Sequence, residues 1–364
     1  MSLQEHQVRI EPHGRTLRVA ATQPVLEAAL AAGLNLPHSC KSGHCGSCRA
    51  RLLAGEIHYP GARPLGLSAE EQRGGQVLLC QARALTDLTV EARLIASVAD
   101  VEIKTLPCRI AALTPLAPDV VQLLLRLPAV ERLPFQPGQY LDVLLAGGRR
   151  RSFSIASPPH DSGPLELHVR RVSGGGFTER LFASTGEVSP TADPAADEVR
   201  AAAAPLRVGS LLRIEGPLGQ FVYREDPRPA LMIAGGTGFA PLKSMLRHAL
   251  ERGSGRVIHL YWGARHVRDV YEESLVLGWT GRHPRFSFTA VLSEASPAEA
   301  AHHRSGWVHE AVLADYADVS AFDVYAAGPP AMIEAIRSTF PRHGLTRERL
   351  HFDSFDYAPD TARP

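Results

Sequence analysis

Four cysteines near the start of the chain have the spacing C-x4-C-x2-C, followed by one more 32 positions later; they are Cys40, Cys45, Cys48 and Cys80. This is the plant-type spacing of a [2Fe–2S] cluster. A loop that wraps a cluster must turn tightly and pass close to the sulfur atoms. Gly43 and Gly46 permit such a path, because glycine adopts positive φ without steric cost. The sequence therefore predicts that these four cysteines are the metal ligands of a two-iron cluster.

A structural zinc site and a Rieske-type centre are the alternatives. Zinc modules usually pair two short knuckles, whereas here one segment supplies three cysteines and Cys80 the fourth. A Rieske centre needs two histidine ligands. His44 is nearby, but four cysteines already complete a ligand set, so His44 is expected to be a surface neighbour. The fifth cysteine, Cys108, is expected to be a buried structural thiol.

Length and charge limit the class of protein. The 364 residues suggest two or three domains. A net charge of +1 argues against nucleic acid or an anionic membrane as the main partner. No apolar run approaches the roughly 18 residues of a membrane span. Residues 1–15 lack the apolar core of a signal peptide, so we expect a cytoplasmic protein.

The first region, residues 1–96, has the pattern of a small α+β domain. A β-hairpin is predicted over 7–19, and after it a helix with Pro24 in its first turn. A short helix is predicted where Ser68 and Glu71 form a capping box.

The second region, residues 97–226, is rich in predicted strands with proline and glycine turns about every 8–12 residues, which predicts a closed antiparallel β-barrel. The predicted strands are 120–127, 140–145, 151–155, 166–170 and 211–215. Segment 184–205 is low in complexity and is predicted to be a surface insertion with a helical turn near 195–204.

The third region, residues 227–364, alternates strand and helix, which predicts a doubly wound parallel sheet. The predicted strands are 231–234, 257–262, 286–292 and 324–327, and the predicted helices are 241–250, 272–277 and 331–340.

Motifs of the second region match the needs of a flavin dinucleotide, which are a cation and N–H donors for the pyrophosphate, a wall for the ring and a hydrogen bond near N5. Arg151 can supply the cation, Phe153 the wall and Ser154 the hydroxyl. Alone, this strand motif also fits an ordinary alternating strand; its place before a glycine-rich helix start favours FAD. The motif residues are Tyr140, Arg151, Ser152, Phe153, Ser154, His168, Val169, Arg170, Gly174, Gly175, Gly176 and Thr178.

A second glycine turn, Gly235-Gly236-Thr237-Gly238, follows a predicted strand and leads to Pro241, so it predicts a pyrophosphate site at a helix N-terminus. It is not the Rossmann fingerprint, because Pro241 stands at the third glycine position. No acidic residue for a ribose 2′-hydroxyl follows the next strand. Arg265 and Arg268 stand there and favour a 2′-phosphate. A second crevice position holds Gly328, Pro329 and Met332.

Together these motifs resemble the ferredoxin–NADP reductase superfamily, in the oxygenase-reductase branch with an N-terminal plant-type ferredoxin domain, and most closely its CDP-6-deoxy-3,4-glucoseen reductase-like members. The segments that carry the resemblance are Lys104–Arg109, Arg151–Ala156, Ala234–Pro241 and Tyr261–Arg265. It implies a β-grasp ferredoxin domain over 1–96, an FAD-binding barrel over 97–226 and an NAD(P)H-binding domain over 227–364.

The resemblance also implies roles for the motif residues. Arg151 would contact the FAD pyrophosphate, Phe153 the flavin ring and Ser154 the region of N5. The other implied contacts are His168 to Arg170 at the isoalloxazine, Gly175, Gly176 and Thr178 at the phosphates, and Gly236 to Pro241, Arg265 and Gly328 to Met332 at the nicotinamide nucleotide. Members of this branch mostly use NADH, which outweighs the arginine argument for NADPH.

Two departures from the family pattern concern the reacting atoms. Phe153 stands where the family usually has a tyrosine. The aromatic wall for the flavin remains, but the hydrogen bond from a phenol hydroxyl to the flavin side chain is lost. Ala327 replaces the cysteine expected beside the nicotinamide, so we expect hydride transfer to be slowed by about 10-fold or more. Ser154 and Ala327 are therefore the residues predicted at the reacting atoms. Phe355 is predicted either to cover the flavin or to pack as an ordinary core side chain.

The implied function is an NADH-dependent electron-transfer reductase that passes electrons through FAD and the cluster to a partner protein, either a multicomponent oxygenase or a pyridoxamine-phosphate dehydratase. The cluster loop, with Lys41, His44 and Arg49, is either the exit surface or a solvated face. A flavin or oxygen reductase without a protein acceptor is one alternative. A degenerate cofactor-binding redox sensor, favoured by Ala327, is the other.

Overall fold

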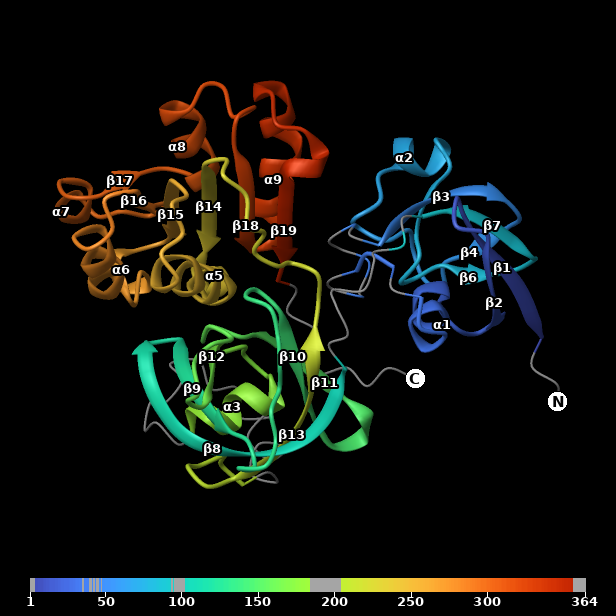
Figure 1. Ribbon diagram of the computed structural model, residues 1–364, viewed down its shortest axis with the longest axis horizontal. Coiled ribbons are helices and arrows are strands. Elements are labelled where there is room, and N and C mark those ends of the chain that lie inside the picture. The colour runs from blue at the N-terminus through green and yellow to red at the C-terminus, as the bar shows by residue number, and fades with distance from the viewer. Residues whose placement is uncertain are drawn as a thin grey trace. The chain divides into compact units, whose positions relative to one another are not determined.

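The computed structural model describes residues 4–34, 36–38, 41, 43, 46, 48–92, 94, 102–183 and 204–355. The chain divides into two compact units, residues 1–101 and 102–364 (Figure 1). Residues 184–203 of the predicted insertion, with nearly all of its predicted helical turn, lie outside the described residues.

The first unit is built on a mixed sheet with strand order β2-β1-β7-β3-β5. β1 (Glu5–Glu11) pairs antiparallel with β2 (Arg15–Ala20), which confirms the predicted hairpin, and parallel with β7 (Leu88–Glu91). Helix α1 follows Pro24 and α2 carries the predicted Ser68–Glu71 capping box. The other elements are α1 (Val25–Ala31), β3 (Arg49–Ala54), β4 (Ile57–His58), α2 (Ala69–Arg73), β5 (Gln76–Leu78) and β6 (Arg83–Ala84).

The second unit begins with an antiparallel sheet of order β11-β10-β13-β8-β9-β12, and a bridge between Ile155 and Leu167 joins its two edges. Its elements are β8 (Lys104–Ala117), β9 (Val120–Arg126), β10 (Tyr140–Leu144), β11 (Arg150–Ser154), β12 (Leu165–Arg170), α3 (Gly176–Phe182) and β13 (Leu211–Leu218). Strand β8 was not predicted. It contains Pro107 and Pro115, and proline within a sequence usually argues against a strand.

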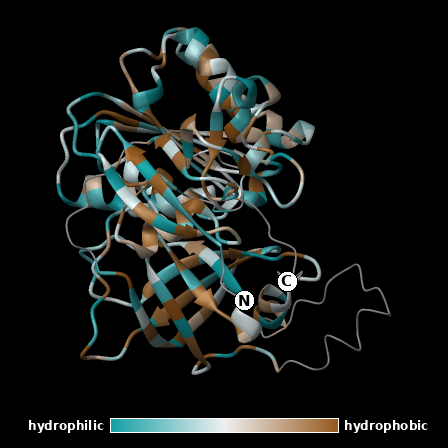
Figure 2. Ribbon diagram, turned by 90° about the vertical axis from the view of Figure 1, so that its right-hand side faces the viewer, coloured by the Kyte–Doolittle hydropathy of each residue, from teal (hydrophilic) through white to brown (hydrophobic). Residues whose placement is uncertain are grey.

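Alternation along the strands sends apolar side chains inward, and Figure 2 shows it as hydrophobic and hydrophilic bands. β12 departs from this alternation, because residues on both of its faces are buried. Leu167 and Val169 pack into the core of this sheet, yet the outward-facing Glu166 and His168 are buried as well. Another part of the unit must therefore cover the outer face of β12.

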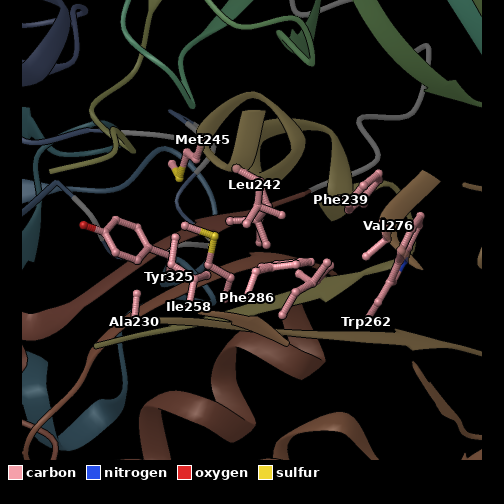
Figure 3. Packing of buried hydrophobic residues seen from close by; sticks show 14 of the residues in the cluster. Ala230, Phe239, Leu242, Met245, Ile258, Trp262, Val276, Phe286 and Tyr325 are labelled. Atoms are coloured by element: carbon pink, nitrogen blue, oxygen red, sulfur yellow. The ribbon is translucent and has the colours of Figure 1, made fainter. Parts of the chain in front are cut away.

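That part is a parallel sheet of order β17-β16-β15-β14-β18-β19. Apolar side chains of α5 and α6 pack on one face, and those of α8 and α9 on the other. In Figure 3, Leu242 points from α5 toward the sheet. The elements are β14 (Ala230–Gly235), α5 (Phe239–Glu251), β15 (Ile258–Ala264), α6 (Glu273–Thr280), β16 (Phe286–Leu292), α7 (Pro297–Ala300), β17 (Arg304–Ser305), α8 (Val308–Asp315), β18 (Asp323–Gly328), α9 (Pro330–Thr339) and β19 (Leu350–Ser354).

The strand order reverses between β14 and β18, and these two strands pair with each other in parallel. Ligands of open parallel sheets bind at the carboxyl ends of the strands at such a reversal. The predicted motifs that begin at Gly235 and Gly328 follow these two strands. Within the described ranges, every helix is too short or too polar to span a bilayer.

Candidate functional site

Two of the four predicted cluster ligands, Cys48 and Cys80, come together in the first unit. Arg49 pairs with Leu78 across β3 and β5, and the Cys48 carbonyl accepts a hydrogen bond from Leu79 N–H at 3.1 Å. Both thiols are buried in the same apolar core. Cys40, Cys45 and His44 lie outside the described residues.

Two described residues of the predicted cluster loop, Lys41 and Gly43, lie against Gln81, and Gly43 also lies against Pro64. Gly43 has φ +85°, and a Cβ there would lie 2.9 Å from both Gln81 Cγ and Pro64 Cβ. Gln81 Nε2 donates to the Lys41 carbonyl at 2.9 Å. This crowding is expected of a loop that passes close to a cluster, so the described backbone around Gly43 and the buried thiols of Cys48 and Cys80 fit a [2Fe–2S] group.

The fifth cysteine behaves as predicted for a structural thiol. Cys108 is buried in the core of the antiparallel sheet. Burial raises its pKa to about 12, so it stays a neutral thiol at physiological pH.

The predicted flavin strand lies on β11 against β10. Tyr140 is opposite Ser154 and Asp142 opposite Ser152, whose hydroxyl donates to Asp142 Oδ1 at 2.6 Å. Alternation puts Arg151 and Phe153 on the other face of β11. Burial, and after it the charge of Arg149, lower the pKa of Arg151, which marks a place where a bound anion would be stabilised.

The predicted phosphate turn lies beside that strand, because the Phe153 ring is 5.6 Å from the ring of Phe177 in α3. Gly174 has φ +75°, and Gly175 is the N-cap of α3. The Thr178 hydroxyl accepts from Val172 N–H at 3.2 Å, so this side chain fixes the shape of the turn.

His168 and Val169 point in opposite directions from β12. Val169 is buried in the core of the sheet, so only its backbone remains for the predicted cofactor contact. The buried His168 ring has Nδ1 2.9 Å from Tyr271 Oη and Nε2 3.0 Å from Glu166 Oε1. Burial raises the pKa of Tyr271 well above its usual range, so the phenol stays protonated.

The nucleotide turn between β14 and α5 has no room for side chains at its glycines. A Cβ on Gly238 would lie 1.8 Å from the Ala327 carbonyl oxygen, and one on Gly235 would lie 2.7 Å from Pro329 Cδ and 2.8 Å from Met332 Sδ. This backbone crowding is the physical reason for glycine here, and it fits a turn that a pyrophosphate approaches closely. Thr237 is buried within the turn and Pro241 lies in the first turn of α5.

The end of β18 forms the other side of this reversal. Ala327 is fully buried and pairs with Ala234 of β14. Gly328 has φ +153°, and its carbonyl accepts from Phe355 N–H at 2.9 Å. The backbone of Phe355 is therefore anchored to the end of β18.

The carboxyl end of β15 carries the predicted Arg265, and the residue before α8 adds an aromatic side chain that the sequence did not predict. Arg265 is exposed, and its Nε lies 4.0 Å from Asp269 Oδ2. Trp307 is 62% exposed and precedes Val308, which packs against Gly263 of β15. An exposed tryptophan at this edge is a surface on which a base can stack. Trp307 differs from a core tryptophan only in its exposure to solvent, which the sequence does not show, so no sequence pattern could have predicted its role.

The two predicted cofactor sites meet at Arg170. A Cβ on Gly236 would lie 2.9 Å from Arg170 Nη1, so a residue of the flavin motif on β12 touches the nucleotide turn. The Arg170 Nε also lies 3.0 Å from Asp119 Oδ2, which orients its guanidinium.

Glu166, His168 and Glu272 have ligand atoms within 4.8 Å of one another, the spacing of a metal site. The Lys243 ammonium lies 2.9 Å from Glu166 Oε1 and 2.6 Å from Glu272 Oε1. A side-chain cation therefore fills this position. This cluster was not predicted from the sequence, although a lysine among the apolar residues of the predicted helix 241–250 is a feature that could have indicated it.

Three domain families match the sequence: a 2Fe-2S iron-sulfur cluster binding domain over residues 8–85, an oxidoreductase FAD-binding domain over 107–188 and an oxidoreductase NAD-binding domain over 232–338. The predicted cofactors, a [2Fe–2S] cluster, FAD and a nicotinamide nucleotide, are thereby confirmed. These domains define the class: an NAD(P)H-dependent flavin and iron–sulfur oxidoreductase.

The chain belongs to the family of such reductases that serve dehydrase and oxygenase systems. It is 35% identical to CDP-6-deoxy-L-threo-D-glycero-4-hexulose-3-dehydrase reductase of Yersinia pestis, over 96% of this chain and 98% of that protein. It is 33% identical to terephthalate 1,2-dioxygenase reductase component 1 of Comamonas sp., over 97% and 98%. The crystal structure of Amycolatopsis cytochrome P450 reductase GcoB aligns with TM-score 0.72 and 33% identity, covering 96% of this chain and 98% of that chain.

Proposed function

We propose that this chain is the reductase component of a two-protein system, taking electrons from NADH and delivering them singly to a protein acceptor. The acceptor is a deoxysugar dehydratase or a multicomponent oxygenase, the two kinds of system named for its relatives. We assign it to the cytoplasm, with neither nucleic acid nor membrane as a partner.

In this proposal the chain consists of three domains. They are a β-grasp ferredoxin domain at 1–96, an FAD-binding β-barrel at 97–226 and a doubly wound NAD(P)H-binding domain at 227–364. The closure of the antiparallel sheet at Ile155 and the parallel order around β14 support the last two labels.

The observation that carries the function is the contact of Arg170 with Gly236. It brings the flavin motif on β12 against the nucleotide turn within one unit, as direct hydride transfer requires. When bound, FAD accepts a hydride and gives up electrons one at a time, the conversion needed between a nicotinamide and an iron–sulfur cluster.

The residues of this chain then have separate tasks in the proposal. Arg151 and the α3 turn bind the FAD pyrophosphate, Phe153 walls the ring, and Ser154 offers its hydroxyl toward N5. The turn that includes Gly238 binds the nicotinamide nucleotide against Ala327. Burial of Ser154 and Ala327 supports their assignment to a part of the unit from which water is excluded.

We propose NADH as the preferred donor. The Arg265 side chain faces the Asp269 carboxylate, which offsets part of the charge that a 2′-phosphate would need. Trp307 would stack on the adenine in either nucleotide and so contributes affinity without selecting between the two.

The test uses purified protein. We expect a flavin and iron–sulfur spectrum, two iron and two sulfide per chain as in any [2Fe–2S] centre, and cytochrome c reduction driven faster by NADH than by NADPH. Cys80→Ser should abolish cytochrome c reduction and leave flavin bleaching by NADH intact.

The matched control is Cys108→Ser, which changes another buried thiol and should keep both activities. Flavin bleaching without onward transfer in the parent protein would point to a flavin or oxygen reductase. A parent protein that NADH does not bleach would favour the redox sensor and overturn the proposal.

A further inference from the structure

A buried lysine joins the flavin-binding and nucleotide-binding parts of the second unit. Lys243 projects from α5, five residues after Gly238 of the nucleotide turn. Its ammonium contacts Glu166 of β12 at 2.9 Å and Glu272, just before α6, at 2.6 Å. The side chains of Lys243, Glu166 and Glu272 are 5%, 9% and 13% exposed. This ion pair is therefore shielded from solvent and belongs to the interior.

The outer face of β12 contacts the nucleotide-binding part at three successive outward positions. Glu166 reaches Lys243 of α5, His168 reaches Tyr271, and Arg170 reaches Gly236. Since alternate residues of a strand share a face, these three contacts form one line. These three contacts together fix where the nucleotide turn lies relative to the flavin motif on β12.

The Lys243 ammonium compensates the negative charges of the buried Glu166 and Glu272 carboxylates at this contact. Glu166 Oε1 also accepts from Gln122 Nε2 at 2.6 Å and from His168 at 3.0 Å. Burial alone would raise the pKa of Glu166, but the His168 hydrogen bond and the Lys243 charge outweigh it and hold the pKa well below its usual range. Within the described part of the chain, Glu272 Oε2 is buried without a hydrogen-bond partner, 3.8 Å from His168 Nε2.

Without the ammonium, two buried carboxylates would face each other across this contact. Removing one partner of a buried ion pair leaves an uncompensated charge and is strongly destabilising. Separation of α5 from β12 would admit water to these carboxylates and relieve that cost. Such a movement displaces the nucleotide turn, because α5 continues directly from it.

We propose that Lys243 is a positioning residue that holds the nucleotide turn on the flavin-binding face of β12 and thereby sets the geometry of hydride transfer. The proposal rests on the proposed function. Lys243 lies beyond the turn and is not assigned a contact with the nucleotide, so its loss affects the transfer step more than nucleotide affinity. Displacement of reacting groups by about 1 Å can cost about 100-fold in rate.

The experiment compares the full-length holoprotein with Lys243→Met, which keeps an unbranched apolar side chain of similar volume and removes the charge. Stopped-flow flavin reduction gives the limiting rate and the apparent Kd for NADH separately. Hydrogen–deuterium exchange of the backbone gives a readout independent of activity. The matched control is Lys104→Met, the same change at a half-exposed lysine of β8, 3.9 Å from Glu131.

We expect Lys243→Met to reduce the limiting rate by about 10-fold or more, to change the Kd less than about 3-fold, and to speed amide exchange in 165–170 and 236–243 but not in 258–264. Lys104→Met should match the parent in all three. An unchanged limiting rate, a loss confined to Kd, or unchanged amide exchange would overturn the proposal.

A double variant keeps the test decisive if Lys243→Met folds poorly. Lys243→Met with Glu166→Gln has the same net charge in the cluster as the parent, so it should fold and retain FAD. It lacks the ammonium bridge, so its limiting rate should stay low; a parental rate would refute the positioning role. If NADH fails to reduce the parent itself, the proposed function falls, while amide exchange still decides whether Lys243 joins the two parts.

Discussion

Arg256 carries a buried guanidinium that ties the segment between β13 and β14 to the parallel sheet. Its Nη2 lies 2.5 Å from Asp323 Oδ2, its Nε donates to Arg228 O at 2.6 Å, and its Nη1 donates to Arg224 O at 3.0 Å. The guanidinium also lies over the ring of Tyr223, 5.5 Å from the centroid. Arg256→Met preserves the apolar stem and removes every one of these polar contacts.

The cost follows from what the substitution leaves behind. The Asp323 side chain is only 8% exposed, so its carboxylate would be a buried charge without its cation. Breaking such a pair costs about 3–5 kcal/mol. A sum over the separate hydrogen bonds gives a similar loss. The hydrogen bond to the Asp323 carboxylate contributes about 1.5–3 kcal/mol, and each of the two hydrogen bonds to a backbone carbonyl contributes about 1 kcal/mol. For a unit of this size, that loss lowers Tm by about 10 °C.

The assay is thermal unfolding of the holoprotein followed by the rise of FAD fluorescence on release, which reports the second unit alone. Arg285→Met is the control, because this exposed arginine also donates to a backbone carbonyl, that of Gly255, at 2.6 Å; its Tm should change by less than about 2 °C. Adding Asp323→Asn to Arg256→Met should recover part of the loss. A Tm within about 2 °C of the parent for Arg256→Met would refute the argument.

Three further outcomes are expected. Ala327→Cys should raise the limiting rate of flavin reduction by about 10-fold, measured by stopped flow; an unchanged or lower rate would contradict the idea that the missing sulfur slows transfer. Gly238→Ala should abolish NADH binding in a titration while FAD is retained, since its Cβ would meet the Ala327 carbonyl; Gly281→Ala, with open space around it, should bind as the parent does. Burial lowers the pKa of His259 to about 4, below the unfolded value of about 6.5, so its contribution to stability is present above pH 6.5 and lost as pH falls toward 4. His259→Gln should flatten the decrease of Tm over that window, and an unchanged slope would show that the histidine is not the group titrating.

Local features of the molecule could be predicted from the sequence because they depend on neighbours in the chain. The hairpin of β1 and β2, the capping box at Ser68 and the glycine turn before α5 all follow from residues a few positions apart. The segments that carry the predicted ligands Cys48 and Cys80 also lie side by side, since the Cys48 carbonyl accepts a hydrogen bond from Leu79 N–H. Strand β8 was missed because its stability comes from partners across the sheet, which outweigh the local effect of two prolines.

The arrangement of the two cofactor sites, by contrast, depends on contacts that the sequence does not encode locally. Lys243 and Glu166 are 77 residues apart, and nothing near either residue predicts their ion pair. The crowding of Gly238 against Ala327, and of Gly236 against Arg170, exists only once separate strands end at the same edge. The sequence alone thus determined which chemistry the chain carries, through ligand types and turn residues. Tertiary packing decided how the groups face one another, because distances between remote segments are fixed only when their apolar faces are buried together.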